Sequence, residues 1–291
     1  IRAPAAGMVV QSASDRVRRT RREVFELLLA DHAPRDPGGP YARFAAALGV
    51  TSSRFAPTAG LPAPDASHPA MLVQLDACIA CGLCERACRE VQHNDVIGFA
   101  HRGEGVRVVF DAARPMGDST CVGCGECVQA CPTGALLPSS VVREGVRAVV
   151  PDRVVPSVCP YCGVGCQVDF HVKDDRIVEV TGRNGPANLG RLCVKGRFGF
   201  DYVRHAERLT VPLVRIEGAA KDAADADDAA AARAKFREAS WEEALDRAAL
   251  GLGRIRDTAG PAALAGFGSA KGSNEEAYLF QKLVRTGFGT N

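Results

Sequence analysis

The residues in this sequence that could do chemistry are its cysteines. All twelve fall between Cys78 and Cys193, and neither the first 77 nor the last 98 residues contain one. Disulfide cysteines are scattered through small secreted folds, whereas ligands of metals and clusters recur at short, regular gaps. The gaps here are of the second kind, at two or three residues. The sequence therefore predicts bound metal.

Two of the cysteine groups repeat one another. They begin 43 residues apart and read Cys78-x2-Cys81-x2-Cys84-x3-Cys88 and Cys121-x2-Cys124-x2-Cys127-x3-Cys131, the second followed by Pro132. In this pattern the first three thiolates bind three irons of a [4Fe–4S] cluster, and the fourth cysteine, one helical turn further on, binds the partner cluster. We therefore predict one cluster on Cys78, Cys81, Cys84 and Cys131, and a second on Cys121, Cys124, Cys127 and Cys88.

Zinc is the alternative metal for these groups, and their spacing argues against it. Tetrahedral zinc sites draw two ligand pairs from knuckles that longer spacers separate. Gly82, Gly123 and Gly125 lie inside the cysteine loops, where the lack of a side chain lets the backbone wrap tightly. Backbone N–H groups left free in such loops would donate to the sulfides and tune the potential.

A third set of cysteines reads Cys159-x2-Cys162-x3-Cys166, with Cys193 further along. Between them the residues 167–172 and 177–180 alternate as in two strands of a hairpin, so the four thiols could converge at its open end. Spacing alone leaves zinc and a third [4Fe–4S] cluster both open. Lys195 follows two residues after Cys193 and could reach from a cluster toward a second redox group; otherwise it is a solvated surface lysine.

The elements around the cysteines are of mixed type. We expect a helix over 12–31 with Ser12 or Ser14 as N-cap, a loop over 33–70 with a short helix near 41–48, and a strand over 106–110. Residues 217–234, almost only Ala and Asp, predict a solvated tether or frayed helix. Capping boxes open two further helices, one at Ser240 with Glu243 and one at Ser273 with Glu276 running through Leu283. The apolar run 262–267 predicts a strand before the second of them, with a turn over 268–272.

Composition excludes several classes of function. A net charge of +2 gives no electrostatic reason to expect nucleic acid or an anionic membrane, and no apolar run approaches the ~18 residues of a membrane span. A hydrophobic content of 46% with 24% charged residues is typical of a soluble globular chain. The Arg21-Arg22 pair lacks the apolar run that an export signal needs, so we interpret it as part of an amphipathic helix. The start at Ile1 and the glycine-rich end predict an internal fragment of a longer protein.

The third cysteine set carries a resemblance to a known family. Residues 159–166, the predicted hairpin, and Arg191-Leu192-Cys193-Val194-Lys195-Gly196-Arg197-Phe198 resemble the [4Fe–4S] domain that opens the molybdenum/tungsten bis-pterin oxidoreductases. With the double cysteine module before it and residues 266–276 after it, the chain from about Ser67 to Asn291 resembles the catalytic alpha subunit of cytoplasmic NAD-dependent formate dehydrogenases.

The resemblance implies an α+β chain in several parts. Residues 1–66 would be a helical and loop remnant of an N-terminal iron–sulfur region, 67–150 a ferredoxin-like module with two [4Fe–4S] clusters, and 151–215 a small [4Fe–4S] domain. Residues 216–239 would be an Ala/Asp-rich insertion. Residues 240–291 would begin the molybdopterin oxidoreductase domain with its first βα unit.

The resemblance also implies cofactors and partners. Three [4Fe–4S] clusters would carry electrons from formate, which leaves as carbon dioxide, toward a flavin- and NAD-binding subunit and a small iron–sulfur subunit in the cytoplasm. A bis-molybdopterin guanine dinucleotide with Mo or W would act in the whole subunit, and Lys195 would lie between the third cluster and the nearer pterin. The family's metal-binding cysteine or selenocysteine comes after this sequence ends, so no catalytic residue can be named.

The sequence departs from the family near its start. The family's N-terminal [4Fe–4S] site has one His and three Cys, and His32 is present here while its cysteine positions hold residues such as Asp36 and Gly39. That cluster cannot form, so His32 is expected to be an ordinary surface or capping histidine. The plant-type [2Fe–2S] domain that the resemblance leads one to expect before this site is also absent from the sequence, being either truncated or never encoded. Two alternatives stay open: a molybdenum-free iron–sulfur subunit of an NADH dehydrogenase or hydrogenase, and a zinc-bound scaffold.

Overall fold

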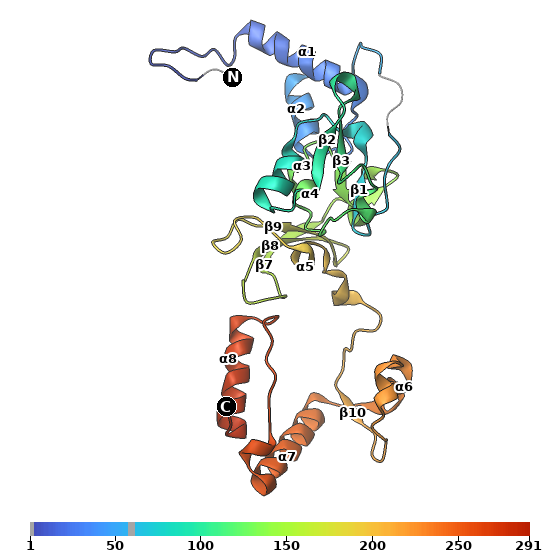
Figure 1. Ribbon diagram of the computed structural model, residues 1–291, viewed down its shortest axis with the longest axis vertical. Coiled ribbons are helices and arrows are strands. Elements are labelled where there is room, and N and C mark those ends of the chain that lie inside the picture. The colour runs from blue at the N-terminus through green and yellow to red at the C-terminus, as the bar shows by residue number, and fades with distance from the viewer. Residues whose placement is uncertain (1–2, 58–61) are drawn as a thin grey trace. The chain divides into compact units, whose positions relative to one another are not determined.

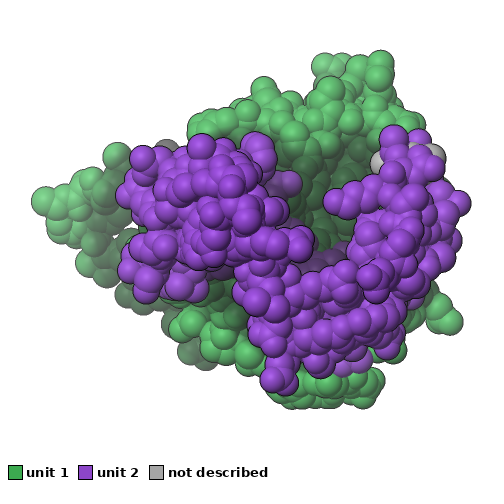
Figure 2. All heavy atoms as spheres, turned by 90° about the horizontal axis from the view of Figure 1, so that it is seen from below, with its two compact units in different colours: residues 1–159, 166–200 green, residues 160–165, 201–291 purple. Residues whose placement is uncertain are grey.

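The computed structural model describes residues 3–57 and 62–291 (Figure 1), so residues 58–61 of the predicted loop lie outside the described residues. The chain forms two compact units, coloured separately in Figure 2. The first unit comprises residues 1–159 and 166–200, and the second comprises residues 160–165 and 201–291.

Two helices open the first unit, α1 (Asp15–Asp31) and α2 (Pro40–Leu48). The Ser14 hydroxyl caps α1 by accepting from the Val17 N–H at 3.4 Å, which confirms the second of the two predicted N-caps. The rings of Phe25 and Tyr41 stack with centroids 5.0 Å apart, so the two helices contact each other through aromatic side chains. The short helix predicted near 41–48 is confirmed.

The cysteine module follows, with short strands and helical turns. Its elements are β1 (Met71–Val73), α3 (Leu83–Arg86), a π-helical turn (Ala87–Val91), β2 (Ile97–Ala100), β3 (Arg107–Phe110), α4 (Glu126–Ala130) and β4 (Leu136–Pro138). Strand β1 pairs antiparallel with β4, and β2 with β3. Met71 and Met116 are buried in the hydrophobic core of this module. The same core contains three buried cysteines, Cys84, Cys88 and Cys127. The strand predicted over 106–110 is confirmed as β3.

A three-stranded sheet completes the first unit after the two-residue strands β5 (Val142–Arg143) and β6 (Val146–Arg147). Its antiparallel order is β7 (Arg153–Val158), β8 (Gln167–Lys173), β9 (Arg176–Gly182). The predicted hairpin is confirmed as β8–β9. Strand β7 is an edge strand that was not predicted, because Pro156 within it argues against a strand and is tolerated only at a sheet edge. Helix α5 (Val194–Phe198) follows, with Cys193 as its N-cap residue.

The second unit carries β10 (Leu213–Arg215), α6 (Ala229–Ala234), β11 (Phe236–Glu238), α7 (Trp241–Ala259) and α8 (Asn274–Lys282), the last continued by a π-helical segment (Leu283–Phe288). Strands β10 and β11 pair antiparallel and bracket the Ala/Asp-rich segment. Its described part contains α6 and a 3-10 turn (Ala223–Ala226), so it is partly helical.

Two expectations for the second unit need correction. The Ser240 hydroxyl accepts from the Glu243 N–H at 3.1 Å, but the Glu243 carboxylate pairs with Arg237, so only half of the predicted capping box forms. The apolar run 262–267 is not a strand: a 3-10 turn occupies Pro261–Ala263, and Phe267 is 95% exposed. Within the described residues this run pairs with no strand, and a strand without a paired neighbour is not stable. The box of Ser273 with Glu276 is confirmed in full.

Across the ranges that the structure describes, no helix combines the length and the apolar character needed to cross a membrane.

Candidate iron–sulfur centres

The first predicted set of thiols surrounds one small cavity. Cys78 follows a 3-10 turn, and Cys81 lies in the loop before α3. Cys84 lies in α3 itself, and Cys131 directly follows α4. All four line the cavity, and the remaining lining is mainly apolar, including Leu75, Ile79, Val108 and Leu136. Burial raises the pKa of the Cys84 thiol to about 12, with further increases from Cys78, Cys131 and Cys81. The structure therefore brings Cys131 to the first loop.

The second set is arranged in the same way. Burial raises the pKa of the Cys127 thiol well above its usual value, and its neighbours Cys124, Cys121, Cys84 and Cys88 raise it further. Cys88 also faces Cys121 and Cys124. The fourth thiol of each copy thus lies with the other copy's loop, and the two groups adjoin through Cys84 and Cys127.

Backbone donors reach these sulfurs. The Gly123 N–H donates to the Cys121 Sγ at 3.4 Å, and the Val96 N–H donates to the Cys88 Sγ at 3.4 Å. Such bonds stabilise a thiolate and shift the potential of a cluster attached to it. In the loops themselves the backbone turns through left-handed conformations, with φ of 51° at Ala80 and 73° at Gly82.

The chemistry of the donor set fits [4Fe–4S] clusters. None of the eight cysteines in the two groups forms a disulfide, so each group offers four thiols. A thiol with a raised pKa stays protonated and is a weak nucleophile, so these groups are not suited to thiol catalysis. A bound metal would reverse the preference for the protonated form, because metals bind the thiolate. Among the described residues, no three His, Cys, Asp or Glu side chains lie close enough to hold a single metal ion. That finding concerns a one-ion site, because the corners of a cubane separate their ligands further.

The third set divides between the units. Cys159, Cys166 and Cys193 belong to the first unit and Cys162 belongs to the second, so the four-cysteine set remains a sequence prediction. Within the first unit, the Cys159 N–H donates to the Cys166 carbonyl at 2.8 Å, where β7 ends and β8 begins. A Cβ built at Gly196 would lie 3.5 Å from the Cys159 Sγ, so α5 packs against this end of the sheet.

Lys195 and its neighbour Arg197 differ sharply in position. Lys195 is exposed on α5, whereas Arg197 is buried and donates to the Cys124 carbonyl at 2.7 Å. Arg197 also pairs with Glu126, whose side chain is only 1% exposed. Sequence reasoning missed this pair, since 71 residues separate its members. The only sequence signal is an acidic residue between Cys124 and Cys127, where an unpaired carboxylate would be costly to bury.

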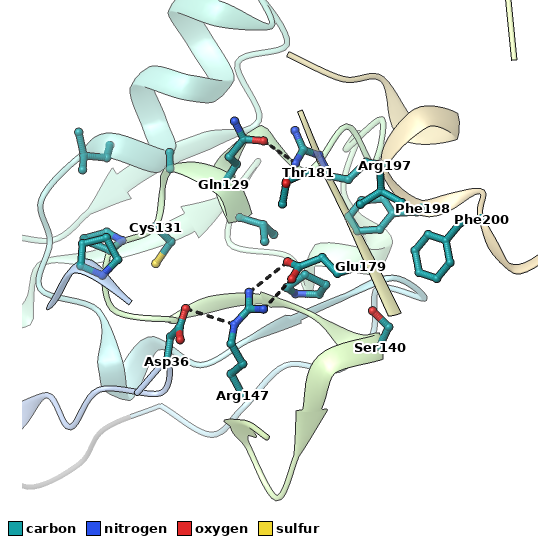
Figure 3. A pocket seen from close by; sticks show the side chains of 17 residues that line it. Asp36, Gln129, Cys131, Ser140, Arg147, Glu179, Thr181, Arg197, Phe198 and Phe200 are labelled. Carbon is teal, nitrogen blue, oxygen red and sulfur yellow. Dashed lines mark hydrogen bonds and ion pairs between the residues drawn. The ribbon is translucent and has the colours of Figure 1, made fainter. Parts of the chain in front are cut away.

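A cavity of about 340 Å³ lies in the first unit beside Cys131 (Figure 3). Its walls carry a chain of charges in which Arg147 pairs with Asp36 at 3.2 Å and with Glu179 at 2.7 Å. Burial alone would lower the pKa of Arg147, but Glu179 and Asp36 raise it, so the guanidinium stays charged. Asp36 stands at a position where the resemblance described above leads one to expect a cysteine. Here it links the N-terminal segment to the rest of the unit.

His32 lies at the C-terminal end of α1, where its backbone N–H caps the helix by donating to the Leu28 carbonyl at 3.0 Å. Its ring Nδ1 lies 3.0 Å from the Asp76 carbonyl oxygen. The expected role of a capping histidine is confirmed.

Three domain families match consecutive parts of the chain. Residues 77–135 match the 4Fe-4S dicluster domain, residues 152–205 the molybdopterin oxidoreductase Fe4S4 domain, and residues 208–291 molybdopterin oxidoreductase. The chain thus carries, in this order, the domains of a molybdopterin oxidoreductase with 4Fe–4S domains. The α+β fold class predicted from the sequence is confirmed.

Individual relatives are similar at modest identity. The Geobacter sulfurreducens protein named NADPH-Fe(3+) oxidoreductase subunit alpha is 32% identical over 290 residues, which cover 98% of this chain and 31% of the relative. A Staphylococcus haemolyticus protein named "Putative formate dehydrogenase" is 33% identical over 253 residues, covering 74% of this chain and 24% of the relative. The chain therefore spans about a third or less of these relatives' length.

Among solved structures, the NAD+-reducing [NiFe]-hydrogenase in its H2-reduced state matches with a TM-score of 0.41 and 28% identity. The match covers 47% of this chain and 62% of that chain.

Proposed function

We propose that this chain relays electrons from formate to NAD within a larger molybdenum or tungsten enzyme. Formate would leave as carbon dioxide and a proton, releasing two electrons. The observation that carries the proposal is the adjacency, inside one compact unit, of two four-thiol groups and the helix that begins after Cys193. The named formate dehydrogenase relatives and the molybdopterin oxidoreductase match support the choice of substrate and cofactor.

The chain's own residues would hold and shield the redox groups. When bound, [4Fe–4S] clusters would supply one-electron sites, and a bis-molybdopterin guanine dinucleotide with Mo or W would supply the two-electron chemistry. We assign Cys78, Cys81, Cys84 and Cys131 to the first cluster, Cys121, Cys124, Cys127 and Cys88 to the second, and Cys159, Cys162, Cys166 and Cys193 to the third. Cys84, Cys88 and Cys127 are buried and would shield that side of the two sites from water, whereas Cys81 is exposed.

Lys195 is assigned the position between the third cluster and the nearer pterin on the basis of the family resemblance. Its exposure on α5 leaves the ammonium free of the core, as such a role requires. Lys195→Ala should slow reduction of the clusters by formate several-fold and leave NADH-driven dye reduction intact. Lys173→Ala, which removes a surface lysine paired with Asp152, is the matched control and should change neither rate. Equal loss of both activities in Lys195→Ala would refute the assignment.

We place the whole enzyme in the cytoplasm, with a flavin- and NAD-binding subunit and a small iron–sulfur subunit as partners. The relative in Geobacter is by its name a subunit, which agrees with an assembly of several chains.

A second function is favoured by the same relative. Its name specifies NADPH as donor and Fe(3+) as acceptor, and it aligns with 98% of this chain. In that case electrons would enter from NADPH, and formate would be inert.

The two functions are separated by adding one donor at a time to the anaerobic holoprotein. EPR signals of reduced [4Fe–4S] clusters that appear with formate support the proposal. Signals that appear with NADPH and not with formate support the second function. Molybdenum and tungsten both absent from iron-loaded protein would overturn the proposal in favour of a molybdenum-free electron-transfer subunit.

A further inference from the structure

Helix α5 docks on the loop that carries the second cysteine group. A Cβ built at Gly123 would meet the Val194 side chain at 3.2 Å, and one built at Gly125 would meet the Arg197 Cδ at 2.2 Å and the Phe198 ring at 2.8 Å. The two distances at Gly125 are shorter than real Cβ atoms show, and the distance at Gly123 is shorter than most of them. The two glycines of this loop therefore leave the room into which α5 fits.

Among the residues that the structure describes, the first cysteine loop has no such partner. Ala80 and Gly82 precede Gly123 and Gly125 by the 43 residues of the repeat and share their left-handed backbone, with φ of 51° and 73° against 66° and 73°. Yet a Cβ at Gly82 would meet only the Phe99 ring at 3.8 Å, an ordinary contact. The close approach is thus specific to the second loop and is not a property of the cysteine motif.

Arg197 ties the two elements together. Its guanidinium donates from Nε to the Cys124 carbonyl at 2.7 Å and from Nη1 to the Gln129 Oε1 at 2.8 Å, and its Nη2 pairs with the Glu126 carboxylate. The Arg197–Gln129 bond is drawn in Figure 3. Arg197 and Glu126 have side chains only 4% and 1% exposed, so both charges are desolvated. A fork of this kind fixes direction as well as distance.

Glu126 has two more partners. It accepts from the Leu192 N–H at 3.2 Å and from the Arg191 Nη1 at 3.2 Å. Both donors directly precede Cys193. Arg191 is 51% exposed, so its charge is screened by water while that of Arg197 is not. The segment on both sides of Cys193 is therefore bound to the helix that carries Cys127.

We propose that Arg197 is a positioning residue for electron transfer: it holds Cys193 against the second cysteine loop and balances the buried charge of Glu126 beside that loop. The inference rests on the proposed relay function. Its consequence is that the cluster on Cys121, Cys124, Cys127 and Cys88 has a higher potential than it would have beside Glu126 alone, since a nearby cation favours the reduced cluster. The cluster of the first loop is not affected.

The test uses redox titration of the anaerobic holoprotein with EPR detection. Arg197→Gln should lower the midpoint potential of the second-loop cluster and weaken its magnetic interaction with the Cys193 cluster. Arg197→Lys keeps the charge and loses the fork, so it should restore the potential and not the interaction. The double variant Glu126→Gln/Arg197→Gln removes the carboxylate that Arg197→Gln leaves unpaired, so it should load iron even if Arg197→Gln does not. It should also return the midpoint potential of the second-loop cluster toward the parent value. Arg191→Gln, the control, shares Glu126 but not Cys124, and both readouts should stay at the parent value.

Iron-loaded Arg197→Gln with the parent's potential and magnetic interaction would overturn the inference. The inference would also be overturned if Arg191→Gln changed the midpoint potential and the magnetic interaction as much as Arg197→Gln does. Loss of any side chain near Cys193 would then be enough to cause the effect. Failure of the relay function looks different: the parent protein itself would lack the clusters or remain unreduced by formate and NADPH. The two failures are therefore distinguishable.

Discussion

The two cysteine loops of the first unit have the same spacing and different surroundings. Leu75, Ile79, Val108 and Leu136 are among the residues that line the cavity of the first group, and no charged side chain belongs to that described lining. The second group lies beside the buried pair of Arg197 and Glu126. One motif, duplicated in the sequence, is thus placed in an apolar setting once and beside fixed charges once.

If the proposed cluster assignment holds, the difference implies that the repeat specifies where iron is held and that its neighbours specify how easily the iron is reduced. Potentials of [4Fe–4S] clusters range over ~−700 to +450 mV according to charge, hydrogen bonding and burial. Two all-cysteine clusters with identical ligands can therefore differ widely. The proposed cause lies partly in the motif, at Glu126, and partly outside it, at Arg197 in the segment that follows Cys193.

The largest effects are expected from the crossed fourth thiols. Cys131→Ser should disturb the cluster of the first loop although Cys131 belongs to the second sequence copy, and Cys88→Ser should disturb that of the second loop. Each variant should lose about four irons, one cluster. Iron analysis with EPR of the remaining signals measures this. If Cys131→Ser affected the second-loop signal alone, the crossed assignment would be wrong.

A smaller effect separates the two equivalent glycines. Gly82→Ala and Gly125→Ala both place a side chain on a left-handed backbone, which costs about 1 kcal/mol each. Gly125→Ala also displaces Arg197 and Phe198 and should lower the free energy of unfolding by a further ~1–3 kcal/mol. Anaerobic denaturant titration of the two variants compares them directly. Equal destabilisation would show that α5 does not pack on Gly125 as described.

A charge can be placed beside the first cysteine group, whose described cavity lining contains no charged side chain. Phe99 is the neighbour of Gly82, so Phe99→Lys puts a cation near the first group, and the potential of that cluster should rise. The rise should be smaller than the fall in Arg197→Gln, because Phe99 is 36% exposed and water screens the new charge. Phe99→Gln is the neutral control. A rise of the same size in both variants would mean that polarity, not charge, is responsible.

The smallest effect concerns Asp111, an exposed carboxylate that adds to the raised pKa of Cys121 after burial and the nearer thiols. Asp111 accepts from the Thr120 N–H at 2.7 Å. Asp111→Asn should raise the potential of the second-loop cluster slightly, since the charge removed is largely screened by solvent. Redox titration at low and at high salt checks this, and a shift that grew with salt would contradict the electrostatic cause.

Much of this arrangement is readable from the sequence. The cysteine spacing predicts two groups of four thiols with exchanged fourth members, Ser14 marks the start of α1, and the alternation over 167–180 predicts the β8–β9 hairpin. These features are local. Strand β7 is not predictable in the same way, because Pro156 disfavours a strand unless an edge is available.

Tertiary features escape the sequence for the same physical reason. The pair of Arg197 and Glu126 joins residues 71 positions apart, and neither residue differs in type from a solvated surface charge. The predicted strand over 262–267 fails because apolar composition does not provide a hydrogen-bonding neighbour. What one segment can specify alone is predicted well, and what needs a second segment is not.

The measurement that tests the central claim most directly is metal and sulfide analysis of the anaerobically purified protein. Three [4Fe–4S] clusters on twelve cysteines predict about twelve irons per chain with matching acid-labile sulfide. Stoichiometric zinc, or about four-fold less iron in protein kept free of oxygen, would contradict the account.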